Sequence, residues 1–210
     1  MNLNFFKKKS YFDLSLIIFL FLYFLIGIYL SLNTGISHDE FHEQKNWEFN
    51  MLLIDSLWKN QEIEITYIDK FYGIGFQYIS QPFQYFFSEI VSNYFGFDAY
   101  GSKLITKHSI VFIFFFISSL FFFKILLKIT NNNQYSILGL ILYLTYPYLL
   151  GHSFFNSKDI PFLSLWLVCT FLSCHIFELL KKENILKFSN LLILSFLTAY
   201  LFSIRITGIL

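Results

Sequence analysis

The sequence predicts an all-α, polytopic transmembrane protein with a large first extracytoplasmic loop that carries interfacial helices. Three observations support this fold class. Hydrophobic residues make up 56% of the chain, and the mean hydropathy is +0.56, which is too apolar for an ordinary soluble domain. Several apolar runs approach the length that crosses a bilayer. Lysines cluster at alternate ends of these runs, as expected for a chain that crosses a membrane repeatedly.

The apolar runs predict five spanning segments, at about residues 14–32, 105–129, 135–150, 160–180 and 188–204. Three lysines precede the first run, as in a signal peptide. However, this run is too long for the apolar region of a signal peptide, and no small-residue cleavage pattern follows it. We therefore expect a retained signal anchor.

The lysine-rich ends, 7–9, 124–128 and 181–187, predict the orientation. Because basic residues mark the cytoplasmic side, the N-terminus is expected in the cytoplasm. The loops of about 33–103 and 151–159 then lie outside. Three lysines fall on the other side and are exceptions to the rule: Lys103, Lys107 and Lys158.

The first loop contains two segments that predict helices. Ser37 and Glu40 form a capping-box pattern, so a helix should begin at His38, and an apolar stripe that includes Trp47 and Trp58 suits the headgroup level. Residues 75–94 are long enough to span, but polar residues interrupt them. A span here would also place the later lysine clusters, 124–128 and 181–187, outside the cell. We expect an amphipathic helix in the membrane interface.

Two polar clusters, 37–43 and 151–162, adjoin the apolar runs, where ionisable residues are costly and usually mark a site. If both clusters lie on one side, they present two acidic groups to one pocket. Asp39 falls in the first helical turn, where the helix dipole favours its ionised form, and its side chain is free to meet a ligand. It could accept a proton from an attacking hydroxyl or bind a metal. Glu40 has an alternative role, which is only to close the capping box.

The second cluster contains more polar residues than helix capping requires, namely His152, Asn156, Lys158 and Asp159. The structural alternative for Asp159 is that it caps the following helix, with Pro161 in the first turn. Arg205 is the single arginine among 15 basic residues and lies at the outer end of the last run. It suits bidentate phosphate binding, and simple snorkelling is the alternative.

His38 and His42 are four residues apart, which places them on one helical face as in zinc-binding H-E-x-x-H, although the glutamate is one place late. A divalent metal bound by these groups is one hypothesis, and a membrane metal-dependent hydrolase would be the corresponding function. Solvated interfacial histidines are the alternative. Cys169 and Cys174 lie five residues apart in one apolar run and predict buried free thiols with no disulfide.

At these residues the chain resembles the GT-C superfamily of membrane glycosyltransferases, in particular the family that includes protein O-mannosyltransferases and aminoarabinose transferases (glycosyltransferase family 39). The resemblance is carried by the acidic pair Asp39-Glu40 after the first span, by Tyr72-Gly73, by the 151–162 block and by Arg205. The block looks like a signature of bacterial members, which implies the bacterial inner membrane. Only the N-terminal part of the family's pattern is present, so we expect a fragment of a longer enzyme and no turnover by the 210-residue chain alone.

The resemblance implies transfer of a sugar from a polyprenyl-phosphate donor to a protein, lipid or glycan acceptor on the extracytoplasmic face. Asp39 would orient or deprotonate the acceptor with support from Glu40, and Asp159 would line the same cavity. Donor binding would involve Arg205 or Lys158, with Tyr72, His152 and Asn156 as further contacts. Some relatives bind a divalent metal, and no nucleic acid is implied. The alternative from another class is a non-catalytic membrane subunit or a transporter fragment.

Overall fold

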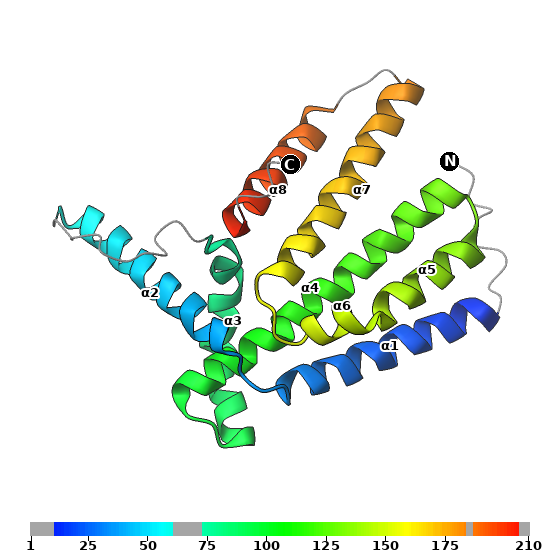
Figure 1. Ribbon diagram of the computed structural model, residues 1–210. Helices are drawn as coiled ribbons and strands as arrows, with labels where there is room; N and C mark the ends of the chain where they lie inside the picture. Colours follow the sequence, from blue (N-terminus) through cyan, green and yellow to red (C-terminus); the bar gives the residue numbers. More distant parts are fainter. Residues whose placement is uncertain (1–10, 61–72, 184–186, 206–210) are drawn as a thin grey trace.

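The computed structural model describes residues 11–60, 73–183 and 187–205, and this part of the chain is all-helical (Figure 1). The predicted all-α fold is therefore confirmed for the described residues. Eight helices follow one another in the described ranges: α1 Tyr11–Leu32, α2 His38–Trp58, α3 Gly75–Phe95, α4 Ala99–Thr130, α5 Asn133–Thr145, α6 Pro147–His152, α7 Asp159–Glu183 and α8 Phe188–Ile204.

Three helices are long and apolar enough to cross a membrane, at Leu14–Leu32, Ala99–Thr130 and Asp159–Lys181. The first matches the predicted segment. The second begins six residues before the predicted 105, because the Asp98 side chain accepts a hydrogen bond from the Gly101 backbone at 2.8 Å and starts the helix there. Helix α8 has the predicted bounds, but its 17 residues leave it shorter than these three helices.

The prediction of one continuous span over 135–150 is wrong. Helix α5 ends at Thr145, Tyr146 is extended, and Pro147 opens the short helix α6. The proline disfavours a helical conformation in the residue before it and cannot donate a backbone hydrogen bond to the preceding turn. The 13 residues of α5 extend for only about 20 Å, which is less than the hydrocarbon thickness of about 30 Å.

Helix α4 is the centre of the bundle and packs against α1, α3, α5 and α7. Its fully buried residues Val111, Phe112 and Phe115 lie at the middle of the apolar core. Helix α1 approaches closely at Gly27, where an added Cβ would lie 1.8 Å from the Phe112 ring. Only 11% of the first spanning segment is buried in the protein, so most of its apolar surface is available to lipid.

The prediction of two buried thiols is half wrong, since Cys169 is buried and Cys174 is exposed. Five residues along a helix rotate the side chain by roughly 140° relative to the first one, so one apolar run need not bury both. Exposure on a long apolar helix leaves Cys174 accessible from outside the bundle.

Helix α2 leaves the bundle and projects away from it, whereas α3 packs beside α4 and α8 (Figure 1). The buried side chains of α2 are polar: Glu40, Gln44, Asn46 and Ser56. The predicted apolar stripe does not pack into the bundle at its far end, since Trp58 is 84% exposed. That stripe and the exposed aromatic residues of α3 are free for another environment, and their place at the headgroup level stays a prediction.

The start of α3 holds the end of α8 at close range. A Cβ added at Gly73 would lie 2.3 Å from the Ile204 carbonyl oxygen, and one at Gly75 would lie 2.7 Å from the Ser203 carbonyl carbon. The Tyr200 hydroxyl donates a hydrogen bond to the Gly75 carbonyl at 2.5 Å. The two glycines therefore allow α8 to end here, which fixes the position of the next residue, Arg205.

Candidate functional site

The two polar clusters of the sequence surround one cavity of about 390 Å³, which lies where α2 begins, where α6 turns into α7 and where α8 ends. It has the size of a small-molecule site. Most of the sequence-predicted site residues line it: Asp39, Glu40, His42, His152, Asn156, Lys158, Asp159 and Arg205. His38 is not among the lining residues, and Tyr72 lies outside the described residues.

Asn156 organises the turn between α6 and α7. Its Oδ1 accepts hydrogen bonds from the backbone N–H groups of Lys158 at 3.1 Å and Asp159 at 2.8 Å, so its Nδ2 must face the other way. Nδ2 donates to His152 Nδ1 at 3.0 Å and to Asp159 Oδ2 at 3.1 Å. Because His152 Nδ1 accepts here, the ring carries its proton on Nε2.

The alternative that Asp159 is only a helix cap is therefore wrong. Asp159 is the first residue of α7, and Asn156 supplies the capping oxygen three residues earlier. The Asp159 carboxylate forms an ion pair with Arg205 instead, and both side chains remain about half exposed. This ion pair joins the second polar cluster to the end of α8.

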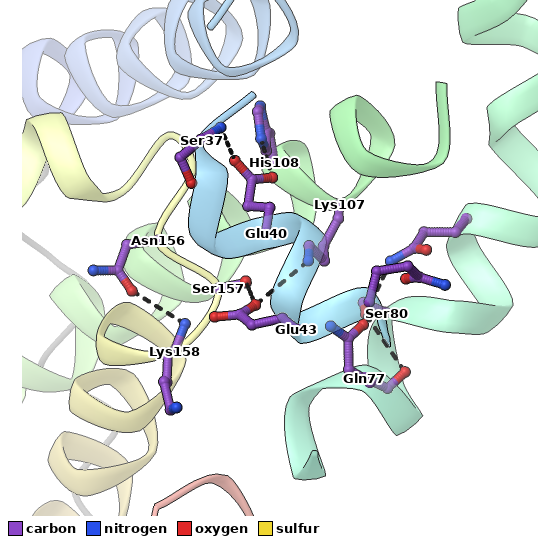
Figure 2. A network of polar contacts seen from close by, with 12 residues as sticks. Ser37, Glu40, Glu43, Gln77, Ser80, Lys107, His108, Asn156, Ser157 and Lys158 are labelled. Carbon is purple, nitrogen blue, oxygen red and sulfur yellow. Dashed lines mark hydrogen bonds and ion pairs between the residues drawn. The ribbon is translucent and has the colours of Figure 1, made fainter. Parts of the chain in front are cut away.

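The Glu40 side chain is buried and closes the start of α2 (Figure 2). One carboxylate oxygen accepts the Ser37 backbone N–H at 2.7 Å, as the capping-box pattern predicts, and the other lies 2.7 Å from His108 Nε2. His108 Nδ1 lies 3.2 Å from the Ser31 carbonyl, which can only accept, so Nδ1 must carry a proton. The Glu40 carboxylate therefore links the start of α2 to His108 of α4.

Glu43, which lines the cavity, forms a second ion pair with Lys107 of α4 (Figure 2). Lys107 Nζ lies 3.5 Å from Glu43 Oε2, and the lysine is fully buried while Glu43 is 16% exposed. The Ser157 hydroxyl donates to the same carboxylate oxygen. A buried lysine needs such a partner, and this one connects α4, α2 and the turn before α7.

Sequence reasoning missed Lys107, His108, Glu43 and Ser157 as parts of the site. The available signal was the Lys107-His108 pair inside an otherwise apolar helix, because ionisable residues there are rarely without a partner. Both are fully buried in α4. Their partners lie 64 and 68 residues away along the chain, so sequence spacing gave no direct indication of them.

Asp39 differs from the other lining carboxylates. Its side chain is exposed and lines the cavity, and no hydrogen bond or ion pair holds it within the described residues. By contrast, Glu40, Glu43 and Asp159 each have a basic partner. Asp39 is therefore the carboxylate best able to accept a proton from a bound molecule.

A metal site at His38 and His42 would need further ligands beside these two side chains. Their Nε2 atoms lie 3.2 Å apart and share a hydrogen bond. No group of three or more His, Cys, Asp or Glu side chains suited to a metal occurs in the described part of the chain. Because catalytic zinc sites use three protein ligands, these two histidines by themselves do not build one.

No family model, no curated protein and no solved structure matches this chain. The cavity and the sequence motifs are therefore the features that indicate a function.

Proposed function

We propose that the protein is a GT-C-type membrane glycosyltransferase that moves a sugar from a polyprenyl-phosphate donor to an acceptor on the extracytoplasmic face. One observation carries the proposal. A single polar cavity holds Asp39, a carboxylate without a partner among the described residues, together with two basic side chains, Lys158 and Arg205. Sugar transfer from a lipid phosphate needs a base for the acceptor and a cation for the departing phosphate, and this cavity supplies both.

In the proposed reaction, an acceptor hydroxyl oxygen attacks the anomeric carbon of the donor sugar, and its proton passes to Asp39. The bond between the anomeric carbon and the phosphate oxygen breaks with its electron pair, so the lipid phosphate leaves with additional negative charge. Arg205 stabilises that charge through its forked N–H donors, and Lys158 adds a point charge. Glu40 contributes by fixing the first turn of α2, which carries Asp39.

The membrane itself is a partner in this proposal. Helices α2 and α3 expose large aromatic side chains, among them Trp58, Tyr85 and Tyr94, each at least 80% exposed. Tryptophan and tyrosine favour the boundary between lipid and water. With these two helices in the interface, the cavity at the start of α2 lies at headgroup level, where a lipid-linked phosphate would arrive.

The test is release of lipid phosphate by the purified full-length enzyme in lipid nanodiscs. Undecaprenyl-phosphate-linked glucose, mannose and arabinose serve as donors, and membrane extracts supply acceptors. Because general-base catalysis typically contributes 10²–10⁴-fold, Asp39→Asn should slow transfer by about that factor. Asp55→Asn is the matched control, since Asp55 lies on the same helix, is 54% exposed and pairs with Lys59 outside the cavity.

Equal rates in Asp39→Asn and wild type would contradict the assigned base. If wild type binds undecaprenyl phosphate with no transfer to any acceptor, a non-catalytic lipid-binding subunit becomes the better account.

A further inference from the structure

Two residues that the proposed function needs for different tasks are paired with each other. Arg205 would hold the phosphate, and Asp159 would act within the same cavity, yet the Arg205 guanidinium contacts the Asp159 carboxylate. Among the described residues this is the one partner of that guanidinium. A phosphate placed beside Arg205 would meet the carboxylate, and two like charges at contact distance repel.

We propose that Asp159 is the resident occupant of an anion site on Arg205, and that the phosphate group of the ligand takes its place. The inference rests on the proposed function and states which anion occupies Arg205 before and after the ligand binds. A carboxylate and a phosphate present similar oxygens to a guanidinium, and two phosphate oxygens can accept two parallel N–H hydrogen bonds from it. The ligand therefore exchanges one hydrogen-bonded anion for another.

Solvent exposure makes this exchange inexpensive. The side chains of Arg205 and Asp159 are 42% and 48% exposed, and ion pairs at such sites stabilise a protein only weakly. The Glu43–Lys107 pair nearby is different, because Lys107 is fully buried and no ligand in the cavity can reach it without rearrangement. Of the two ion pairs, only Asp159–Arg205 has a basic side chain that a phosphate in the cavity can contact.

The displaced carboxylate would stay in position. Asp159 Oδ2 accepts a hydrogen bond from Asn156 Nδ2 at 3.1 Å, and Asn156 is itself held by two backbone N–H groups and by His152. After the exchange, phosphate neutralises Arg205, so Asp159 loses the ion-pair partner that it has within the described residues. Anion binding therefore prepares the cavity for a proton or another positive group.

The experiment measures binding of undecaprenyl phosphate, and separately of inorganic phosphate, to the full chain in nanodiscs. Removal of the competing charge should tighten binding, so Asp159→Asn should lower the Kd about two- to five-fold, the range set by an exposed ion pair. Arg205→Lys should raise the Kd, because lysine lacks the bidentate fork. Asp55→Asn, which disrupts an exposed ion pair outside the cavity, should leave it unchanged.

An unchanged or higher Kd in Asp159→Asn would overturn the exchange. Failure of both undecaprenyl phosphate and inorganic phosphate to bind would overturn it as well. Asp159→Ser carries the same expectation if the asparagine variant fails to fold. Binding of undecaprenyl phosphate alone would mark a lipid site, whereas similar binding of inorganic phosphate would mark a general anion site. If Asp159→Asn tightens binding while wild type transfers no sugar, the anion site stands and the proposed function fails.

Discussion

At the scale of single residues, neighbours in the sequence have opposite surroundings. Asp39 is exposed in the cavity, while Glu40 is 2% exposed and bound by Ser37 and His108. Consecutive helical residues point about 100° apart, so one side chain can face the cavity and the next the bundle. The acidic pair therefore divides into a group available for chemistry and a group that holds the helix in place.

This division predicts a stability effect for His108→Ala. The variant leaves the Glu40 carboxylate buried without its partner, which typically costs about 3–5 kcal/mol. Denaturant unfolding of the purified protein measures the loss. His175→Ala is the control, because His175 is an exposed histidine on α7, and its removal should change the unfolding free energy by less than about 0.5 kcal/mol. Equal effects of the two variants would mean that the Glu40–His108 contact contributes little.

At the scale of helices, the site depends on where three of them start or stop. Asn156 sets the start of α7, Ser37 and Glu40 set the start of α2, and the contact with Gly73 and Gly75 sets the end of α8. Each of these ends delivers at least one charged residue to the cavity. Shifts of a whole helix should therefore affect the cavity even when no lining residue changes.

Gly75→Ala tests this dependence. The added Cβ would lie 2.7 Å from the Ser203 backbone, which cannot rotate away, so α8 must move. Overpacking of this kind costs about 1–3 kcal/mol, and the movement should displace Arg205 and weaken binding of undecaprenyl phosphate. Gly35→Ala should change neither quantity, because nothing lies within 4 Å of its added Cβ. Unaltered phosphate binding in Gly75→Ala would mean that the position of the end of α8 does not control the phosphate site.

At the scale of the whole molecule, the shared cavity requires both polar clusters to lie on one side of the membrane. The start of α2 and the turn before α7 meet at the same end of the bundle, while the connection between α4 and α5 lies at the opposite end (Figure 1). From the lysine distribution we predict that the cavity end lies outside the cell.

Cysteine labelling checks this topology after Cys169 and Cys174 are replaced. Gly35→Cys and Gly151→Cys place thiols where nothing lies within 4 Å of the new Cβ, and both should react with an impermeant reagent from outside intact cells. Gln134→Cys, at an exposed position at the start of α5, should react only after permeabilisation. If the impermeant reagent labels Gly35→Cys and fails to label Gly151→Cys in intact cells, the two polar clusters lie on opposite sides of the membrane.

Local chemistry in the sequence determined the all-helical class, the first and last apolar helices and the capping of α2 by Glu40. These features depend on residues within a few positions of one another, which is why spacing and composition predict them. Tyr146-Pro147 carried an equally local signal for the break between α5 and α6, but the apolar run concealed it.

Only the tertiary structure decided which charges are paired. Sequence reasoning identified Asp39, Asp159 and Arg205 as polar residues near the membrane, but their separation along the chain says nothing about contact. The bundle joins Asp159 to Arg205, buries Lys107 against Glu43 and leaves Asp39 without a partner among the described residues. Contacts between helices distant in sequence set the surroundings of each charge, and those surroundings determine which carboxylate remains available for chemistry.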